Sequence, residues 1–318
     1  MSNGEMILFS GNGNKLLANE ICETLNIKLG DATVEKFSDS ETSVKIKQDV
    51  RGKDIFIIQP TSPPVNDNLI ELLIIIDALR RASARRITAV LPYYGYARQD
   101  RKDQPRVPIT AKLVANLVTV AGANRVLTID LHAGQIQGFF DIPLDNLYAI
   151  NVFIDYFLNM KIKDITVVSP DVGGIKMARA YAKRLSAPLA IVDKRRKSDK
   201  DTEVMHIMGE VEGRNVVLID DIVATASSLV EAVNALKNHG AKDVYAAIAH
   251  PVLSGPAIDR IKKCPIKELV VTNTIHIDEK RLIPQIKVLS IAGLIGEAIV
   301  RIHDERSISS LFDEDFKT

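Results

Sequence analysis

The chain has 318 residues, of which 46% are hydrophobic and 25% are charged. These proportions exclude a disordered or fibrous protein, and the length is enough for two domains of ordinary size. The net charge of +1 gives no overall electrostatic reason to expect a nucleic-acid or membrane partner, so any cationic site must be local.

Short aliphatic runs alternate with helical patterns along the chain. The expected strands are residues 6–9, 54–59, 87–91, 125–130, 164–169, 189–193, 215–220 and 244–249. The expected helices include 15–25, 68–81, 109–120 and one that begins at Leu229. These strands are almost continuously apolar, which is typical of a parallel sheet covered on both faces. The alternation therefore predicts an α/β fold with right-handed crossovers.

The two halves of the chain also resemble each other. Residues 78–89 align with residues 235–246 at an offset of 157 positions. In each copy a helix ends, the chain turns, and a buried strand follows. The equal spacing favours duplication over chance. We therefore expect two similar α/β domains, 1–148 and 149–318, each with a mainly parallel sheet flanked by helices.

The cysteines and the apolar segments indicate where the protein works. Cys22 and Cys264 lie far apart in sequence and form neither a disulfide framework nor a metal-ligand spacing. The first residues lack the basic-then-apolar pattern of a signal peptide. The most apolar helix, near residues 69–79, contains Glu71 and Asp77 and is too short to span a bilayer. We expect a cytoplasmic protein.

Two acids, Asp220 and Asp221, follow four aliphatic residues at the end of an expected strand. Ligands of parallel sheets bind beyond the carboxyl ends of the strands. The small residues 224–228 would let their backbone N–H groups and the following helix N-terminus form an anion site. The alternative is an ordinary serine-capped loop. The paired acids, which would accept hydrogen bonds from sugar hydroxyls, favour a ribose-phosphate site.

Asp130 and His132 leave another expected strand together, and Asp171 follows a third. Carboxylates with a histidine suit Mg²⁺ where substrate phosphates complete the coordination shell. Their spacing lacks the specificity of a zinc site. Taken alone, His132 is better explained as a hydrogen-bonded loop residue. The three together predict a metal site.

Two further segments carry clustered polar groups. The run Lys194 to Lys197 directly follows a strand. Such a run is usually a solvated loop, but at a strand end it could close on polyphosphate and stabilise charge during phosphoryl transfer. Residues 92–101 place tyrosines beside Arg98 and Gln99. This composition suits base stacking and phosphate contact, or equally a subunit contact.

Along nearly its whole length the chain resembles the phosphate-activated class of ribose-phosphate pyrophosphokinases. The matching segments are 37–41, 95–102, 130–140, 194–196, 220–221 and 250–257, and the run 130–140 is the most distinctive. The resemblance implies two phosphoribosyltransferase-like domains with the catalytic site between them. It implies a reaction of Mg-ATP with ribose 5-phosphate that gives 5-phosphoribosyl 1-diphosphate and AMP. It also implies homo-hexamers built from dimers, activated by phosphate and inhibited by ADP.

The same resemblance assigns roles to individual residues. The catalytic cations are Lys194 and Arg196, and the Mg²⁺ ligands are His132 and Asp171, with Asp130 nearby. The ATP contacts are Phe37, Asp39, Ser40, Glu41, Arg98 and Gln99. The ribose 5-phosphate contacts are Arg196, Asp220, Asp221, Ala224, Thr225, Ala226, Ser227 and Ser228.

The phosphate loop departs from the family's pattern Asp-Asp-x-x-Asp-Thr-x-Gly-Thr. Ala224 replaces the third acid, Ser227 replaces the glycine, and Ser228 replaces the last threonine but keeps a hydroxyl. Ser227 would strain the loop if its φ were positive. Ser40, where the family often has glycine, is a milder departure. Two other functions stay open: a phosphoribosyltransferase that consumes 5-phosphoribosyl 1-diphosphate, and a catalytically weakened regulatory subunit.

Overall fold

The computed structural model describes residues 4–195 and 204–311, which divide into two compact units. Within the described residues, the first unit comprises 4–148, 274–276 and 290–311. The second comprises 149–195, 204–273 and 277–289. The sequence-based division near residue 148 is a single cut, whereas the described chain returns to the first unit at residues 274–276 and again at residue 290.

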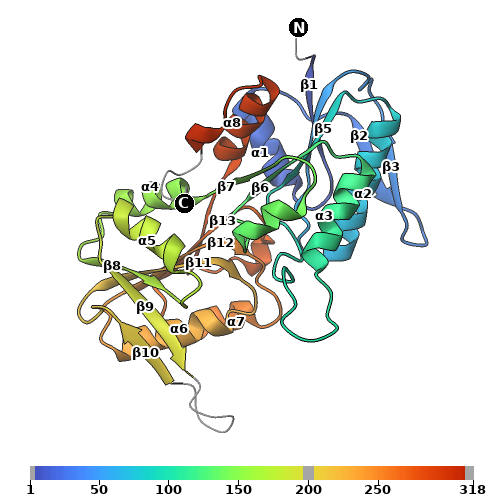
Figure 1. The fold of residues 1–318 in the computed structure, drawn as a ribbon. Coiled ribbons are helices and arrows are strands. Elements are labelled where there is room, and N and C mark those ends of the chain that lie inside the picture. The colour runs from blue at the N-terminus through green and yellow to red at the C-terminus, as the bar shows by residue number, and fades with distance from the viewer. Residues whose placement is uncertain (1–3, 196–203, 312–318) are drawn as a thin grey trace. The chain divides into compact units, whose positions relative to one another are not determined.

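The first unit is built on a parallel sheet of five strands in the order β1-β4-β5-β6-β7 (Figure 1). These strands are β1 (Met6–Ser10), β4 (Asp54–Ile58), β5 (Arg86–Leu91), β6 (Arg125–Ile129) and β7 (Leu144–Leu147). Every residue of β4 is buried. Because helices cover both faces of the sheet, its central strands are apolar without alternation, as the sequence predicted.

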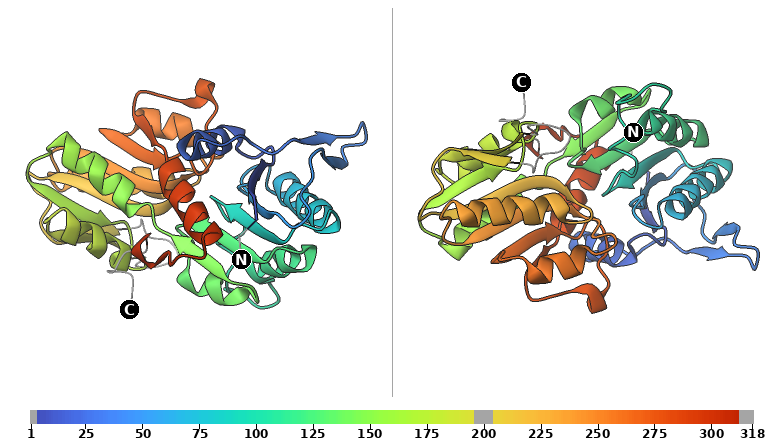
Figure 2. Two further views of the ribbon diagram at one scale, coloured as in Figure 1. Left: turned by 90° about the horizontal axis from the view of Figure 1, so that it is seen from above. Right: turned by 90° about the horizontal axis from the view of Figure 1, so that it is seen from below.

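Four α-helices cover this sheet. They are α1 (Lys15–Leu25), α2 (Val65–Arg81), α3 (Thr110–Ala121) and α8 (Ala292–His303), accompanied by the short 3-10 turns η1 (Gly134–Phe139) and η3 (Ser309–Leu311). The helices α2 and α3 pack together on one face, and α1 packs with α8 on the other (Figures 1 and 2). The bounds of α1 match the sequence-based prediction because Asn14 caps its first turn and Asn26 ends it in the left-handed conformation.

A buried carboxylate holds the end of α8 against the sheet. Asp54 is 1% exposed and accepts a hydrogen bond from Arg86 Nε at 2.8 Å. His303 Nδ1 lies 2.8 Å from the same carboxylate. Arg86 Nη2 also donates to the carbonyl of Ile302 at 2.9 Å. The C-terminal helix is therefore attached at the points where β4 and β5 begin.

A two-stranded antiparallel sheet, β2 (Ala32–Lys36) with β3 (Thr42–Ile46), projects from the first unit beside α2 (Figure 1). It was not predicted from the sequence. No residue of either strand is fully buried, so the hydrophobic pattern that marks the central strands is absent here.

The second unit contains a sheet of seven strands in the order β10-β9-β8-β11-β12-β13-β14. Its strands are β8 (Ile165–Ser169), β9 (Leu189–Arg195), β10 (Val204–Met208), β11 (Asn215–Val223), β12 (Val244–Pro251), β13 (Glu268–Thr272) and β14 (Ile286–Leu289). Its helices are α4 (Ile150–Met160), α5 (Ile175–Arg184), α6 (Ser227–Asn238) and α7 (Ala257–Lys263), with the turn η2 (Glu279–Arg281). Only the pairing of β9 with β10 is antiparallel among the described strands of this sheet.

The two sheets share one topology. The run β1-β4-β5-β6-β7 corresponds in order and direction to β8-β11-β12-β13-β14, and the helices that lead into the third strands are α2 and α6. This correspondence supports the predicted duplication and confirms the α/β fold. Of the strands in these two sheets, the sequence-based prediction omitted β7, β10, β13 and β14. No helix in the described part of the chain is both long and apolar enough to cross a membrane.

Candidate active site

A cavity of about 440 Å³ lies in the first unit among the segments that follow β5 and β6. Its lining includes two predicted ATP contacts, Arg98 and Gln99, and one predicted metal ligand, His132. The other lining residues are Asp100, Arg101, Asp103, Val107, Pro108, Ala133 and Gln135. Tertiary structure thus brings together residues from two separate motifs, with two arginines that suit phosphate groups.

Hydrogen bonds fix the walls of this cavity. The Gln99 side chain accepts from Thr110 Oγ1 at 2.5 Å, and its carbonyl accepts from Ala111 N–H at 3.1 Å, so it is tied to the start of α3. Gln135 Nε2 donates to Asp100 Oδ2 at 2.8 Å and joins the two loops. Asp100 and Gln135 were not predicted as site residues from the sequence, although they lie within the segments 95–102 and 130–140 that carried the resemblance.

His132 reaches the cavity through a sharp turn at Asp130. Asp130 is 6% exposed and has a φ of 40°, which non-glycine residues seldom adopt. Its N–H donates to the Leu147 carbonyl at 2.8 Å, and the next N–H, of Leu131, donates to Asn146 Oδ1 at 3.0 Å. The neighbouring strand β7 therefore holds this unfavourable conformation in place.

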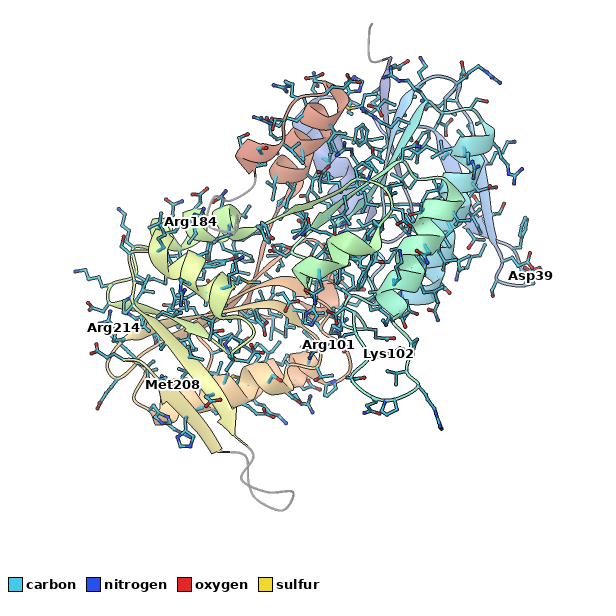
Figure 3. All side chains as sticks on the ribbon, in the orientation of Figure 1. Asp39, Arg101, Lys102, Arg184, Met208 and Arg214 are labelled. Atoms are coloured by element: carbon cyan, nitrogen blue, oxygen red, sulfur yellow. The ribbon has the colours of Figure 1, made fainter. Side chains whose placement is uncertain are left out.

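The other predicted ATP contacts, 37–41, lie elsewhere on the first unit. They form the turn between β2 and β3, closed by hydrogen bonds from Phe37 N–H to the Glu41 carbonyl at 2.8 Å and from Ser40 N–H to the Phe37 carbonyl at 2.9 Å. Figure 3 shows Asp39 at the outer tip of this turn, far from Arg101 and Lys102. Phe37 is 58% exposed. Within the first unit, the structure does not bring these residues to the cavity.

In the second unit, the predicted acids lie inside a strand and not after it. β11 continues to Val223, and Asp220 pairs with Ile248 of β12. Asp221 is 8% exposed, and its N–H donates to Asp220 Oδ1 at 2.9 Å. Desolvation raises the pKa of Asp220 well above its ordinary value, and the negative charges of Asp221 and Asp171 raise it further.

This clustering of negative charge matters for the site. Although the Asp220 side chain retains some exposure, its carboxyl is surrounded by protein and by like charge. Asp171 faces its own turn, where Oδ1 accepts from Gly174 N–H at 2.8 Å. Sugar hydroxyls or a cation would relieve the repulsion among these acids. The arrangement therefore favours a ligand that brings hydrogen-bond donors or positive charge.

The predicted phosphate loop, 224–228, joins β11 to α6. Two successive carbonyls at its start, those of Val223 and Ala224, accept hydrogen bonds from the N–H groups of Leu253 and Ser254. Ala226 has the left-handed φ of 60°, and Ser227 is the first residue of α6. The condition for strain at Ser227, a positive φ, is therefore not met. The residue with an unfavourable φ is Ala226, one place earlier.

Of the two predicted catalytic cations, the structure describes only the backbone of Lys194. The backbone of Lys194 belongs to β9 and pairs with Met205 of β10, so Lys194 lies in a strand and not in the loop expected from the sequence. The side chain of Lys194 and all of Arg196 lie outside the described residues. Their roles stay predictions.

No three histidine, cysteine or acidic side chains gather as a metal-binding group anywhere in the described ranges. Asp171 belongs to the second unit, whereas His132 and Asp130 belong to the first and offer one imidazole and carboxylate oxygens. This donor set fits a hard cation that is bound mainly through substrate phosphates, and it does not fit a site built from protein ligands alone.

The chain is similar to known proteins along nearly its whole length. Residues 6–122 match the family described as the N-terminal domain of ribose phosphate pyrophosphokinase, and residues 195–313 match the phosphoribosyl synthetase-associated domain. The ribose-phosphate pyrophosphokinase of Bacillus caldolyticus is 56% identical over 97% of this chain and 98% of its own length. That of Rhizobium meliloti is 58% identical over 97% and 100%.

The chain belongs to the ribose-phosphate pyrophosphokinase family. The crystal structure of phosphoribosylpyrophosphate synthetase from Mycobacterium smegmatis agrees with this assignment. It superimposes with a TM-score of 0.90 at 41% identity and covers 95% of this chain and 99% of its own.

The structure shows the backbone conformation at the two positions, Ser227 and Ser40, where this chain has serine in place of the glycine of the family's pattern. At Ser227, the glycine of the family's pattern is replaced where the backbone is helical, so a Cβ is tolerated. At Ser40, the residue that often is glycine has a φ of 75°. The departure that looked milder in the sequence is thus the one with an unfavourable backbone conformation.

Proposed function

We propose that this chain transfers the diphosphoryl group of Mg-ATP to the 1-hydroxyl of ribose 5-phosphate. The products are 5-phosphoribosyl 1-diphosphate and AMP. The observation that carries the proposal is the near-full-length identity of 56% and 58% to proteins named for this reaction. The cavity lined by Arg98, Gln99 and His132 and the acid pair before the loop 224–228 are both consistent with it.

The chemistry asks for positioning more than for covalent work. The sugar 1-hydroxyl attacks the β-phosphorus and loses its proton, while the bond from the β-phosphorus to the bridging oxygen breaks and AMP leaves with that oxygen. Arg98 and Gln99 would hold the nucleotide. Asp220 and Asp221 would accept hydrogen bonds from ribose hydroxyls, and the N–H groups of 224–228 would bind the 5-phosphate. Lys194 and Arg196 would stabilise the transferring phosphates.

Mg²⁺ is the cofactor we propose, held by His132 and Asp171 with Asp130 nearby. When bound with ATP, it would neutralise charge on the phosphate oxygens. The protein's own contribution is to orient these side chains, and for His132 this is done by the strained turn at Asp130.

We also propose that the protein works as a homo-oligomer, in which the turn 37–41 serves the nucleotide site of a neighbouring copy. Phe37 is a large, exposed apolar side chain in this turn, and Asp39 of the same turn lies far from Arg101 of the cavity (Figure 3). The adenine ring of ATP bound at the nucleotide site of another copy would stack on the exposed ring of Phe37. The hexamer, phosphate activation and ADP inhibition expected from the family remain part of this proposal.

A second feature favours association of identical chains. On α3, Leu113, Leu117 and Val120 are 54%, 38% and 75% exposed at helical spacing. The other exposed residue of this helix, Asn116, is also uncharged. Two copies related by a twofold axis could therefore join these faces without bringing like charges together.

The decisive experiment measures AMP formed from ATP and ribose 5-phosphate in the presence of Mg²⁺ and phosphate. Turnover supports the proposal. Binding of ribose 5-phosphate without turnover would favour the catalytically weakened subunit, for which the replacement of the third acid by Ala224 is the remaining argument. In that case Ala224→Asp should restore a large part of the rate. Consumption of 5-phosphoribosyl 1-diphosphate with a free base would favour a phosphoribosyltransferase.

A further inference from the structure

Residues 253–260 of the second unit donate hydrogen bonds to the start of the loop 224–228. Leu253 N–H donates to the Val223 carbonyl at 3.0 Å, and Ser254 N–H donates to the Ala224 carbonyl at 2.8 Å. Arg260 Nη1, from α7, donates to the Thr225 carbonyl at 2.8 Å. Three consecutive carbonyls are thus engaged by residues 253–260, all of which follow β12.

These hydrogen bonds also determine the direction of the N–H group in each of the three peptides. In a trans peptide, the carbonyl of one residue and the N–H of the next are directed oppositely. When the carbonyls of 223–225 face the segment 253–260, the N–H groups of 224–226 face away from it. Among the described residues these three N–H groups donate to no other residue. They are therefore available to an anion on the other side of the loop.

The peptide between Thr225 and Ala226 is the one that needs support. Ala226 has a φ of 60°, a conformation that an L-residue with a Cβ adopts at an energetic cost. The two preceding carbonyls are held by backbone donors, which any sequence would supply. Thr225 is held by a side chain, and that side chain carries a positive charge. The orientation of the Ala226 N–H therefore depends on the identity of residue 260.

We propose that Arg260 is a positioning residue for ribose 5-phosphate binding, which acts by fixing the Thr225–Ala226 peptide so that its N–H points to the 5-phosphate. The inference rests on the proposed function of the loop 224–228. Arg260 does not belong to the residues that the sequence patterns assign to the site. Arg281, whose guanidinium donates to the carbonyl of Leu253, supports the same segment one step further away.

The test compares Arg260→Met with Lys263→Met. Both variants remove one positive charge from α7, but Lys263 is exposed and has no contact with the loop 224–228 among the described residues. Arg260→Met should raise the KM for ribose 5-phosphate about tenfold, since a hydrogen bond from a charged donor contributes roughly that factor. The KM for ATP should stay within about twofold of wild type. Lys263→Met should change neither constant.

Arg260→Lys keeps the charge and one donor, so its KM for ribose 5-phosphate should lie between those of wild type and Arg260→Met. It also keeps the test possible if Arg260→Met does not fold. Calorimetric titration with ribose 5-phosphate alone gives the same comparison without turnover. Wild-type protein that binds ribose 5-phosphate but forms no AMP would defeat the proposed activity and leave this test intact.

Three results would overturn the role of Arg260. One is an unchanged affinity of Arg260→Met for ribose 5-phosphate. Another is an equal loss in Lys263→Met, which would point to overall charge. The third is a parallel rise in the KM for both substrates with a lowered melting temperature, which would indicate general damage to the fold.

Discussion

Replacing Ala226 or Ser227 with glycine should change stability in opposite directions. Ala226 has a φ of 60° and Ser227 begins α6. A left-handed conformation costs an L-residue roughly 1–2 kcal/mol, whereas glycine loses about 0.5–1 kcal/mol of conformational freedom on folding. Ala226→Gly should therefore stabilise the protein by about 0.5–1 kcal/mol. Ser227→Gly has no strain to relieve and should destabilise by about 0.5–1 kcal/mol.

These free energies correspond to shifts of about 1–4 °C in melting temperature for a domain of this size, upward for Ala226→Gly and downward for Ser227→Gly. Differential scanning fluorimetry or calorimetry resolves both. The family's sequence pattern, taken alone, predicts the reverse, because it has glycine at position 227. Stabilisation by Ser227→Gly together with destabilisation by Ala226→Gly would show that the loop conformation described here is wrong.

Three further outcomes are expected. Asp220→Asn should stabilise the protein at pH values above the raised pKa of Asp220 but not in acid. Because the pKa of Asp220 is raised, its stabilising contribution is complete below the ordinary carboxyl range and is lost as pH rises through its pKa in the folded protein. Melting temperatures of both proteins measured against pH test this. Weaker binding of ribose 5-phosphate should accompany the gain in stability of Asp220→Asn. Phe37→Ala and Arg98→Ala should each lower activity, and mixed oligomers should regain activity that neither has alone if the turn 37–41 serves a neighbouring copy; a mixture no better than its components would refute this. Leu117→Asp on the exposed face of α3 should reduce the oligomer size seen by light scattering, while Leu158→Asp, at another exposed leucine, should not.

Local sequence determined the elements that carry their own start and stop signals. Asn14 caps α1 and Asn26 ends it, so the predicted helix 15–25 has the observed bounds. The continuous apolar runs of β4 and β5 reflect burial on both faces and were located to within one residue at each end. The hairpin of β2 and β3 could not be found in this way, because its strands are only partly buried and their pairing is defined by the partner strand.

The candidate site was predicted as residue types, and the structure decided their grouping. Arg98 and His132 come from different motifs, yet they line one cavity because β5 and β6 are neighbours in the sheet. Phe37 was assigned to the same nucleotide, but it belongs to the turn between β2 and β3, whose Asp39 lies far from that cavity within the first unit (Figure 3).

The sequence by itself determined the family, the duplicated α/β architecture and the chemical character of each strand end. Only tertiary structure decided that α8 returns to the first unit, through contacts of His303 and Ile302 with Asp54 and Arg86. It likewise placed the left-handed residue at Ala226. The physical reason is the same in both cases. These conformations are fixed by hydrogen bonds between residues distant in sequence, as from Arg260 to Thr225, and no local pattern records which donor will reach which acceptor.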